Sequence, residues 1–153
     1  MNLTQKETSL LNDLKSSEQL CIEKYGKGAA EANDPALKTL FQNLKENEES
    51  HLGTINRILG GEEVEMAAAP TAVSQTFSSP LSTCTEDQKT SDAFLCKEAL
   101  AMEKHVSSVY DVSIFEFSCP ALRDTLSHIQ KEEQNHGQKL YQYLSQNNMY
   151  GAS

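Results

Sequence analysis

The feature that most constrains this chain is an internal repeat. Shifting the numbering by 85 aligns DPALK at residues 34–38 with CPALR at residues 119–123. The same register, without a gap, also pairs a tyrosine, two histidines and several glutamates; these matches include Tyr25 with Tyr110, Glu18 with Glu103, Glu48 with Glu133 and His51 with His136. The two halves of the chain are therefore two copies of one unit.

Each copy is predicted to be a helical hairpin. Glycine and proline are scarce, with 7 and 4 residues, and apolar residues recur at spacings of three and four. Capping boxes at Thr4-x-x-Glu7 and Thr85-x-x-Gln88 mark two helix starts, Pro35 suits the first turn of another helix, and Gly60-Gly61 marks an end. Asn147-Asn148 suits the last helix end, since Asn tolerates the left-handed conformation. We expect helices at about 4–32, 35–59, 86–117 and 120–147, with a crossover at about 60–85. This pattern predicts an all-α four-helix bundle, two repeated hairpins joined by a long crossover, in a single domain over residues 1–153.

Every predicted helix carries one apolar stripe that polar residues interrupt near its middle. A lone glutamate interrupts the first and third stripes, and Glu-x-x-His interrupts the second and fourth. Glu18 lies 16 residues before Asp34 and Glu48 lies 14 after it, so both stand at about the same height above that turn. The second copy repeats this spacing around Cys119. If the hairpins pack face to face, six side chains converge on one cavity: Glu18, Glu48, His51, Glu103, Glu133 and His136.

Four carboxylates in an apolar core cost several kcal/mol each when nothing pairs with them. No Lys or Arg lies on the same stripes, whereas two divalent cations would balance the four charges. One Glu from each of two helices with Glu-x-x-His from the other two is the ligand set of di-iron and di-manganese bundles. We predict two iron ions bound by those six residues, with manganese or zinc as alternatives. The alternative without a metal is a set of ordinary buried or surface polar residues.

Two tyrosines lie two helical turns after the lone glutamates. Tyr25 and Tyr110 are either core aromatics or donors of a hydrogen bond to a ligating carboxylate on a facing helix, and we favour the second role because both copies keep the tyrosine. Off the stripes, several acidic residues should face water, and two histidines should lie at the surface; these are Glu23, Glu46, Glu49 and Glu132, then His105 and His128.

The charge, the apolar runs and the cysteines of the chain argue against several classes of partner and location. A net charge of −9 argues against nucleic acid and anionic membrane surfaces, and no apolar run is long enough to span a bilayer. The start of the chain lacks the pattern of a signal peptide, so a cytoplasmic location is expected. The four cysteines form no C-x-x-C pair, which argues against a zinc knuckle or dithiol motif and favours reduced thiols.

The two Glu…Glu-x-x-His halves resemble the ferritin-like superfamily, in particular rubrerythrins and bacterioferritins, and the resemblance covers all four helices. It implies a di-metal site that reacts with peroxide or dioxygen. Rubredoxin-like cysteine pairs are missing, so an external electron donor would be needed. The segment from Leu3 to Phe41 and the ending from Pro120 to Tyr150 are also similar to the spore coat protein F (Coat F) family. That likeness implies association with coat proteins of a bacterial endospore.

Three functions follow from these patterns. The first is a redox enzyme, an oxidoreductase in which two iron ions reduce peroxide or dioxygen. The second is a spore coat or assembly protein whose metal site is structural or vestigial. The third is iron oxidation and storage. A homodimer is expected because bundles of this kind commonly associate.

Overall fold

The computed structural model describes residues 1–65, 75–77 and 83–150, and the fold is an all-α four-helix bundle as predicted. The helices are α1 (Gln5–Glu31), α2 (Pro35–Leu59), α3 (Glu86–Glu116) and α4 (Pro120–Gln146). Each begins and ends within one residue of the range expected from the sequence. Among the residues described there is no strand, and no helix there is both long and apolar enough to cross a membrane.

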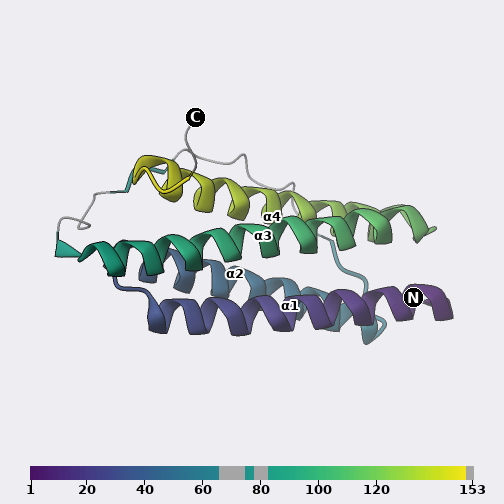
Figure 1. Ribbon diagram of the computed structural model, residues 1–153. Helices are drawn as coiled ribbons and strands as arrows, with labels where there is room; N and C mark the ends of the chain where they lie inside the picture. Colours follow the sequence, from purple (N-terminus) through teal and green to yellow (C-terminus); the bar gives the residue numbers. More distant parts are fainter. Residues whose placement is uncertain (66–74, 78–82, 151–153) are drawn as a thin grey trace.

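The helices pack as two antiparallel hairpins in two layers (Figure 1). α1 lies against α2 and α3 lies against α4, and the hairpins meet mainly through α1 and α3. α2 ends at one end of the bundle and α3 begins at the other (Figure 1). Much of the crossover expected at 60–85 lies outside the described residues. The described part includes Phe77, whose ring packs edge-on against Tyr143 at 5.2 Å between centroids.

The helix starts are those that the sequence predicts. Both capping boxes form, at Thr4 with Glu7 and at Thr85 with Gln88. Asp34 caps α2 by accepting a hydrogen bond from the backbone of Ala36. At the equivalent position before α4, Cys119 provides no side-chain cap. At the other end of α4, Asn148 adopts a φ of 56°, the left-handed conformation expected there.

Carboxylates near the starts of α1 and α3 tie the two hairpins together. Asp92 of α3 is fully buried and accepts hydrogen bonds from the backbone N–H groups of Asn33 and Asp34, in the turn between α1 and α2. At the other end, Glu7 of α1 accepts bonds from the backbone and hydroxyl of Ser118, in the turn between α3 and α4. The repeat relates these two arrangements, so each hairpin fixes the turn of the other.

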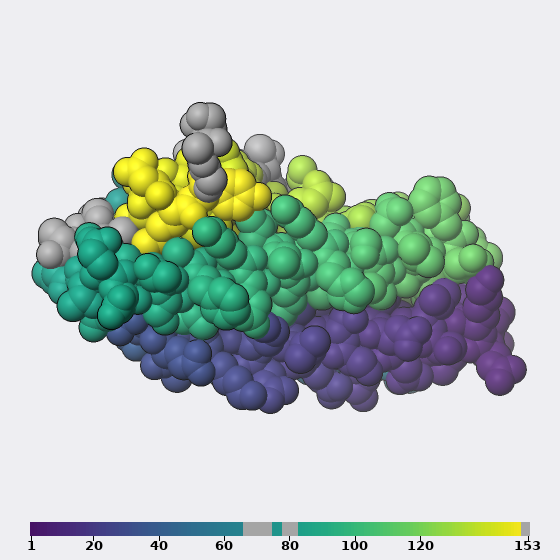
Figure 2. Space-filling view, viewed as in Figure 1, coloured from purple at the N-terminus to yellow at the C-terminus, as the bar shows by residue number. Residues whose placement is uncertain are grey.

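The apolar stripes form the core. Every stripe position in the four helices is buried, from Leu11 in α1 to Tyr143 in α4. In the space-filling view, α1 and α3 lie along each other over most of their lengths (Figure 2). The glutamates and histidines that interrupt the stripes are therefore enclosed halfway along the bundle.

Candidate metal centre

All six predicted ligands meet in the middle of the bundle, and none is more than 2% exposed. Each of these side chains lies on the same helix face as its apolar stripe. The packing that buries leucines above and below therefore also buries these polar side chains. The four helices contribute in the predicted manner, a glutamate from α1 and α3 and a Glu-x-x-His from α2 and α4. The residues brought together are Glu18, Glu48, His51, Glu103, Glu133 and His136.

Their ligand atoms form two overlapping groups of four, and within each group all atoms lie within 4.8 Å of one another. Glu48 and Glu133 belong to both groups. Glu18 and His51 complete the first, and Glu103 and His136 complete the second. The 85-residue shift converts one group into the other, so the internal repeat produces a pseudo-symmetric pair of sites that share two carboxylates.

Each histidine contacts two carboxylates of its own group. Nδ1 of His51 lies 3.1 Å from Oε2 of Glu48 and 3.0 Å from Oε1 of Glu133. Nδ1 of His136 lies 3.1 Å from Oε1 of Glu48 and 3.3 Å from Oε1 of Glu103. The two imidazole rings stack with centroids 5.7 Å apart. Both histidines thus turn the same ring nitrogen, Nδ1, toward the carboxylates.

The two tyrosines bond to carboxylates across the hairpin interface, as expected. The Tyr25 hydroxyl in α1 donates to Oε1 of Glu103 in α3, and the Tyr110 hydroxyl in α3 donates to Oε1 of Glu18 in α1. Both tyrosines are at most 1% exposed. Each therefore fixes the orientation of one lone glutamate and leaves its second oxygen directed elsewhere.

Glu132 and His128 correct two expectations from the sequence. Glu132 was expected to face water, but its Oε2 lies 2.9 Å from Nε2 of His51 and its side chain is 24% exposed. His128 was expected at the surface, but its side chain is only 11% exposed and its Nε2 lies 2.5 Å from Oε1 of Glu132. The stripe pattern missed both because it follows one helix at a time, whereas Glu132 is placed by its contact with His51 of α2 and His128 by its contact with Glu132. His105 is exposed, as expected.

Glu132 completes an arrangement that is typical of metal-binding histidines. A ligating imidazole usually donates its other N–H to a carboxylate, which fixes the ring and makes the ligand more basic. His51 has Nδ1 among the cluster carboxylates and Nε2 against Glu132. The pairing with His51 also lowers the pKa of Glu132, so this carboxylate stays ionised. The only signal in the sequence is the position of Glu132 directly before a stripe glutamate.

Burial and mutual repulsion give the buried carboxyl groups different pKa values. Burial, followed by the charge of Glu133, raises the pKa of Glu18 to about 11 and that of Glu103 to about 7. Burial also acts to raise the pKa of Glu48, but hydrogen bonds with the histidines outweigh it and lower the pKa. Burial opposes protonation of His51, yet hydrogen bonds to Glu132 and neighbouring carboxylates raise its pKa well above the usual value. The cluster therefore holds protons where a bound cation could replace them.

The donor set fits divalent metal ions. In the part of the chain that the structure describes, Oε2 of Glu18, Glu103 and Glu133 is buried without a hydrogen-bond donor. Glu18 faces Glu48 and Glu103 faces Glu133, and two carboxylates in contact need a shared proton or a cation between them. Carboxylate oxygens and imidazole nitrogens are ligands that iron, manganese and zinc accept.

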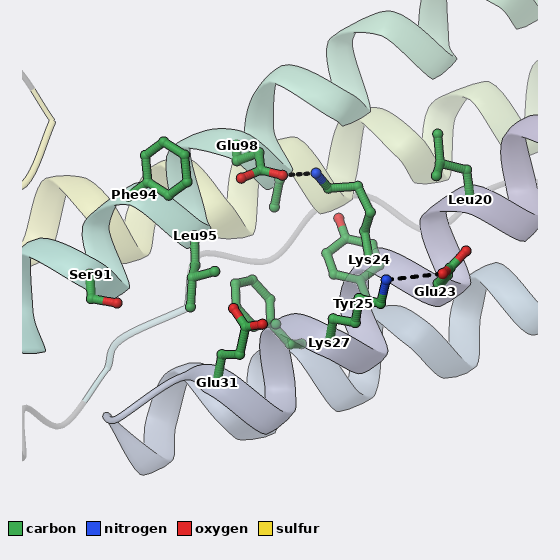
Figure 3. Close-up of a pocket in the computed structure, with 13 residues that line it drawn as sticks. Leu20, Glu23, Lys24, Tyr25, Lys27, Glu31, Ser91, Phe94, Leu95 and Glu98 are labelled. Atoms are coloured by element: carbon green, nitrogen blue, oxygen red, sulfur yellow. Dashed lines mark ion pairs between the residues drawn. The ribbon is translucent and has the colours of Figure 1, made fainter.

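Two pockets approach the cluster from different sides. One of about 360 Å³ lies between α3 and α4 and has Glu103 and Glu133 in its wall. The other, of about 470 Å³, lies between α1 and α3 (Figure 3). An ion pair between Lys24 and Glu98 crosses it (Figure 3), and the ring of Tyr25 forms part of its wall. The hydroxyl of that tyrosine donates to Glu103, so Tyr25 lies between the α1–α3 pocket and the cluster.

The four cysteines are free thiols, as expected. Cys21 and Cys96 are buried in the core, and Cys84 and Cys119 are partly exposed. Burial is the main cause that raises the pKa of Cys21 and Cys96, so both remain protonated and apolar in character. None of them belongs to the two groups of ligand atoms.

Comparison with protein families finds one match, the Coat F domain, over residues 91–153. The matched segment covers less than half of the chain and includes Tyr110, Glu103, Glu133 and His136. The similarity expected for the first hairpin lies outside it, as does the ligand half around Glu48. Searches of curated proteins and of solved structures give no match. The Coat F likeness is thus supported for the second hairpin, and the ferritin-like resemblance stays a prediction.

Proposed function

We propose that this chain is a Coat F-type protein of the bacterial endospore coat whose bundle binds two divalent metal ions, iron or manganese. The match of residues 91–153 to the Coat F domain supports the location. The observation that carries the metal proposal is the set of three buried carboxylate oxygens without donors, inside two groups of four ligand atoms. Neither line of support depends on the other, so each needs its own test.

The residues of this chain would hold the two ions in a shared arrangement. Glu48 and Glu133 belong to both groups and would contact both ions. His51 and Glu18 would bind only one ion, and their counterparts in the second hairpin would bind the other. Tyr25 and Tyr110 would hold the lone glutamates through hydrogen bonds, and Glu132 would hold the ring of His51.

A redox function is the second candidate. Two iron ions would supply one electron each for the reduction of peroxide or dioxygen, with an external donor to restore them. The observation that favours it is the pocket between α3 and α4, because its wall includes Glu103 and Glu133 and because its volume admits a small oxidant. The surrounding apolar stripes would exclude bulk water from the reaction.

Metal content per chain tests the metal proposal. Protein reconstituted with Fe²⁺ under anaerobic conditions, or with Mn²⁺, should contain two ions per chain by elemental analysis, one for each ligand group. His51→Ala and His136→Ala should each reduce the content toward one ion, because each histidine belongs to one group. Glu48→Ala should remove both, whereas Glu46→Ala, on the exposed face of the same helix, should change nothing. Equal metal content in the wild type and Glu48→Ala would refute the proposed ligands.

The coat proposal is tested by location. A fluorescent fusion expressed during sporulation should accumulate at the spore surface and be recovered with the coat fraction. The Glu48→Ala fusion separates the two parts of the proposal: if it still reaches the spore surface, the metal site is not needed for coat assembly. Uniform fluorescence of the wild-type fusion in the mother-cell cytoplasm throughout coat formation would contradict a coat role.

A further inference from the structure

The pocket between α3 and α4 leads from the exposed surface of the bundle to two residues of the buried cluster. Lys104 and Gln134 are exposed residues of its lining, and Ser107 and Gly137 are half-buried. Deeper in the bundle, Glu103 and Glu133 line it while being only 2% and 1% exposed. Oε2 of both glutamates lacks a hydrogen-bond donor among the described residues. The pocket thus extends to the two residues that carry these buried carboxylate oxygens.

The internal repeat shows why this pocket lies on the second hairpin. The shift of 85 residues relates Gly137 to Leu52 and Ser107 to Ile22, and both large residues are half-buried in the first hairpin. Leucine and isoleucine therefore occupy the positions beside Glu18 and Glu48 that glycine and serine occupy beside Glu103 and Glu133. Two small residues account for the opening on one side of an otherwise pseudo-symmetric bundle.

The size and charge of the pocket suit a hydrated metal ion. Six waters at about 30 Å³ each occupy about 180 Å³, less than the pocket volume of about 360 Å³. Lys104 places one positive charge near the opening, whereas the cluster beyond contains four carboxyl groups. At the inner end, the carboxylate oxygens of Glu103 and Glu133 would replace waters that the ion sheds.

We propose that the α3–α4 pocket is the entrance through which divalent metal ions reach the buried cluster, kept open by Gly137 and Ser107. This inference rests on the proposed metal binding. All six ligands are buried, so an ion needs a route between helices, and this pocket is lined by two of the ligands themselves. The larger pocket between α1 and α3 is a poorer route, because Tyr25 stands between it and the cluster.

The test is the rate of metal uptake after the pocket is filled. Gly137→Leu and Ser107→Ile each install the residue found at the equivalent position of the first hairpin. Gly53→Leu is the matched control, because Gly53 is exposed on α2 and a Cβ added there has no neighbour within 4 Å outside the adjacent helix backbone. Chelator-treated protein is mixed with Co²⁺ in a stopped-flow instrument, uptake is followed by the visible absorption of the bound ion, and final metal content is measured after long incubation.

In the filled variants an entering ion has to displace the added side chain, which costs energy. Gly137→Leu and Ser107→Ile should therefore slow metal uptake by about tenfold or more, with the final metal content unchanged. Gly53→Leu should match the wild type. Uptake by both filled variants at the wild-type rate would overturn the entrance while leaving the metal site intact. A wild-type protein that takes up no Co²⁺ would overturn the metal site and the entrance together. If Gly137→Leu does not fold, Ser107→Ile and the milder Gly137→Ala, whose added carbon lies 3.6 Å from Leu100, decide the result.

Discussion

Under the proposed metal binding, replacing Glu133 by glutamine should abolish most of the stabilisation that the metal ions would give to this bundle. Glu133 is 1% exposed, belongs to both ligand groups, and lies 3.0 Å from Nδ1 of His51. Glutamine keeps the shape of the side chain but removes the negative charge and one acceptor oxygen. Both ions therefore lose a charged ligand from a single substitution, while the packing of α4 is preserved.

The expected magnitude follows from the two ligand groups. At a free ion concentration of about 100 times Kd, each bound ion stabilises the folded state by about 2.7 kcal/mol, or about 5 kcal/mol for both. For a chain of this length, about 2–4 °C of Tm per kcal/mol gives a rise of about 10–20 °C. In Glu133→Gln the same addition should raise Tm by less than about 4 °C, which corresponds to about 1 kcal/mol.

The assay is thermal unfolding followed by circular dichroism, with Mn²⁺ and with chelator, because Mn²⁺ avoids the oxidation that iron undergoes. Each protein serves as its own reference, so any effect of the substitution on the chelated state cancels. Glu49→Gln removes an equal charge from the exposed face of α2 and should keep the full metal-dependent rise. A full rise in Glu133→Gln, or no rise in the wild type, would refute the reasoning.

Further predictions concern the residues around the cluster and the helix starts. Glu132→Gln should weaken metal affinity by about 10–100-fold in a calorimetric titration, because it loosens the ring of His51, whereas Glu46→Gln should have no effect. Tyr110→Phe should destabilise the protein by about 1–3 kcal/mol in denaturant unfolding with chelator, because it leaves a buried carboxyl oxygen without its donor; an unchanged midpoint would contradict this. Cys119→Ser should add an N-cap to α4 and stabilise it by about 1 kcal/mol, while Cys84→Ser should not. Metal uptake at pH 7 should release protons, since cations replace those that burial keeps on Glu18 with its pKa near 11, so affinity should fall as the pH is lowered.

The sequence by itself determined the secondary structure, the hairpin repeat and the six residues that meet in the centre. Helix starts such as Thr4 and Thr85 depend on side-chain bonds to the nearest backbone, which are local and therefore visible in the sequence. The stripes are also local, because the helical period alone decides which residues share a face. Glu18 and Glu48 lie at equal heights above one turn. The sequence therefore places these side chains at one level of the bundle, and no packing angle is needed for that.

Only the tertiary structure decided which side chains meet across helices and where a pocket remains between them. Whether Glu132 reaches His51, and whether Asp92 caps the turn at Asn33, depends on how closely two helices from different hairpins approach. The pocket beside Gly137 is equally non-local, because a missing side chain leaves a space only where no neighbour fills it. Short-range rules follow one helix at a time, so they locate the six clustered side chains but not the contacts and openings that arise where helices pack.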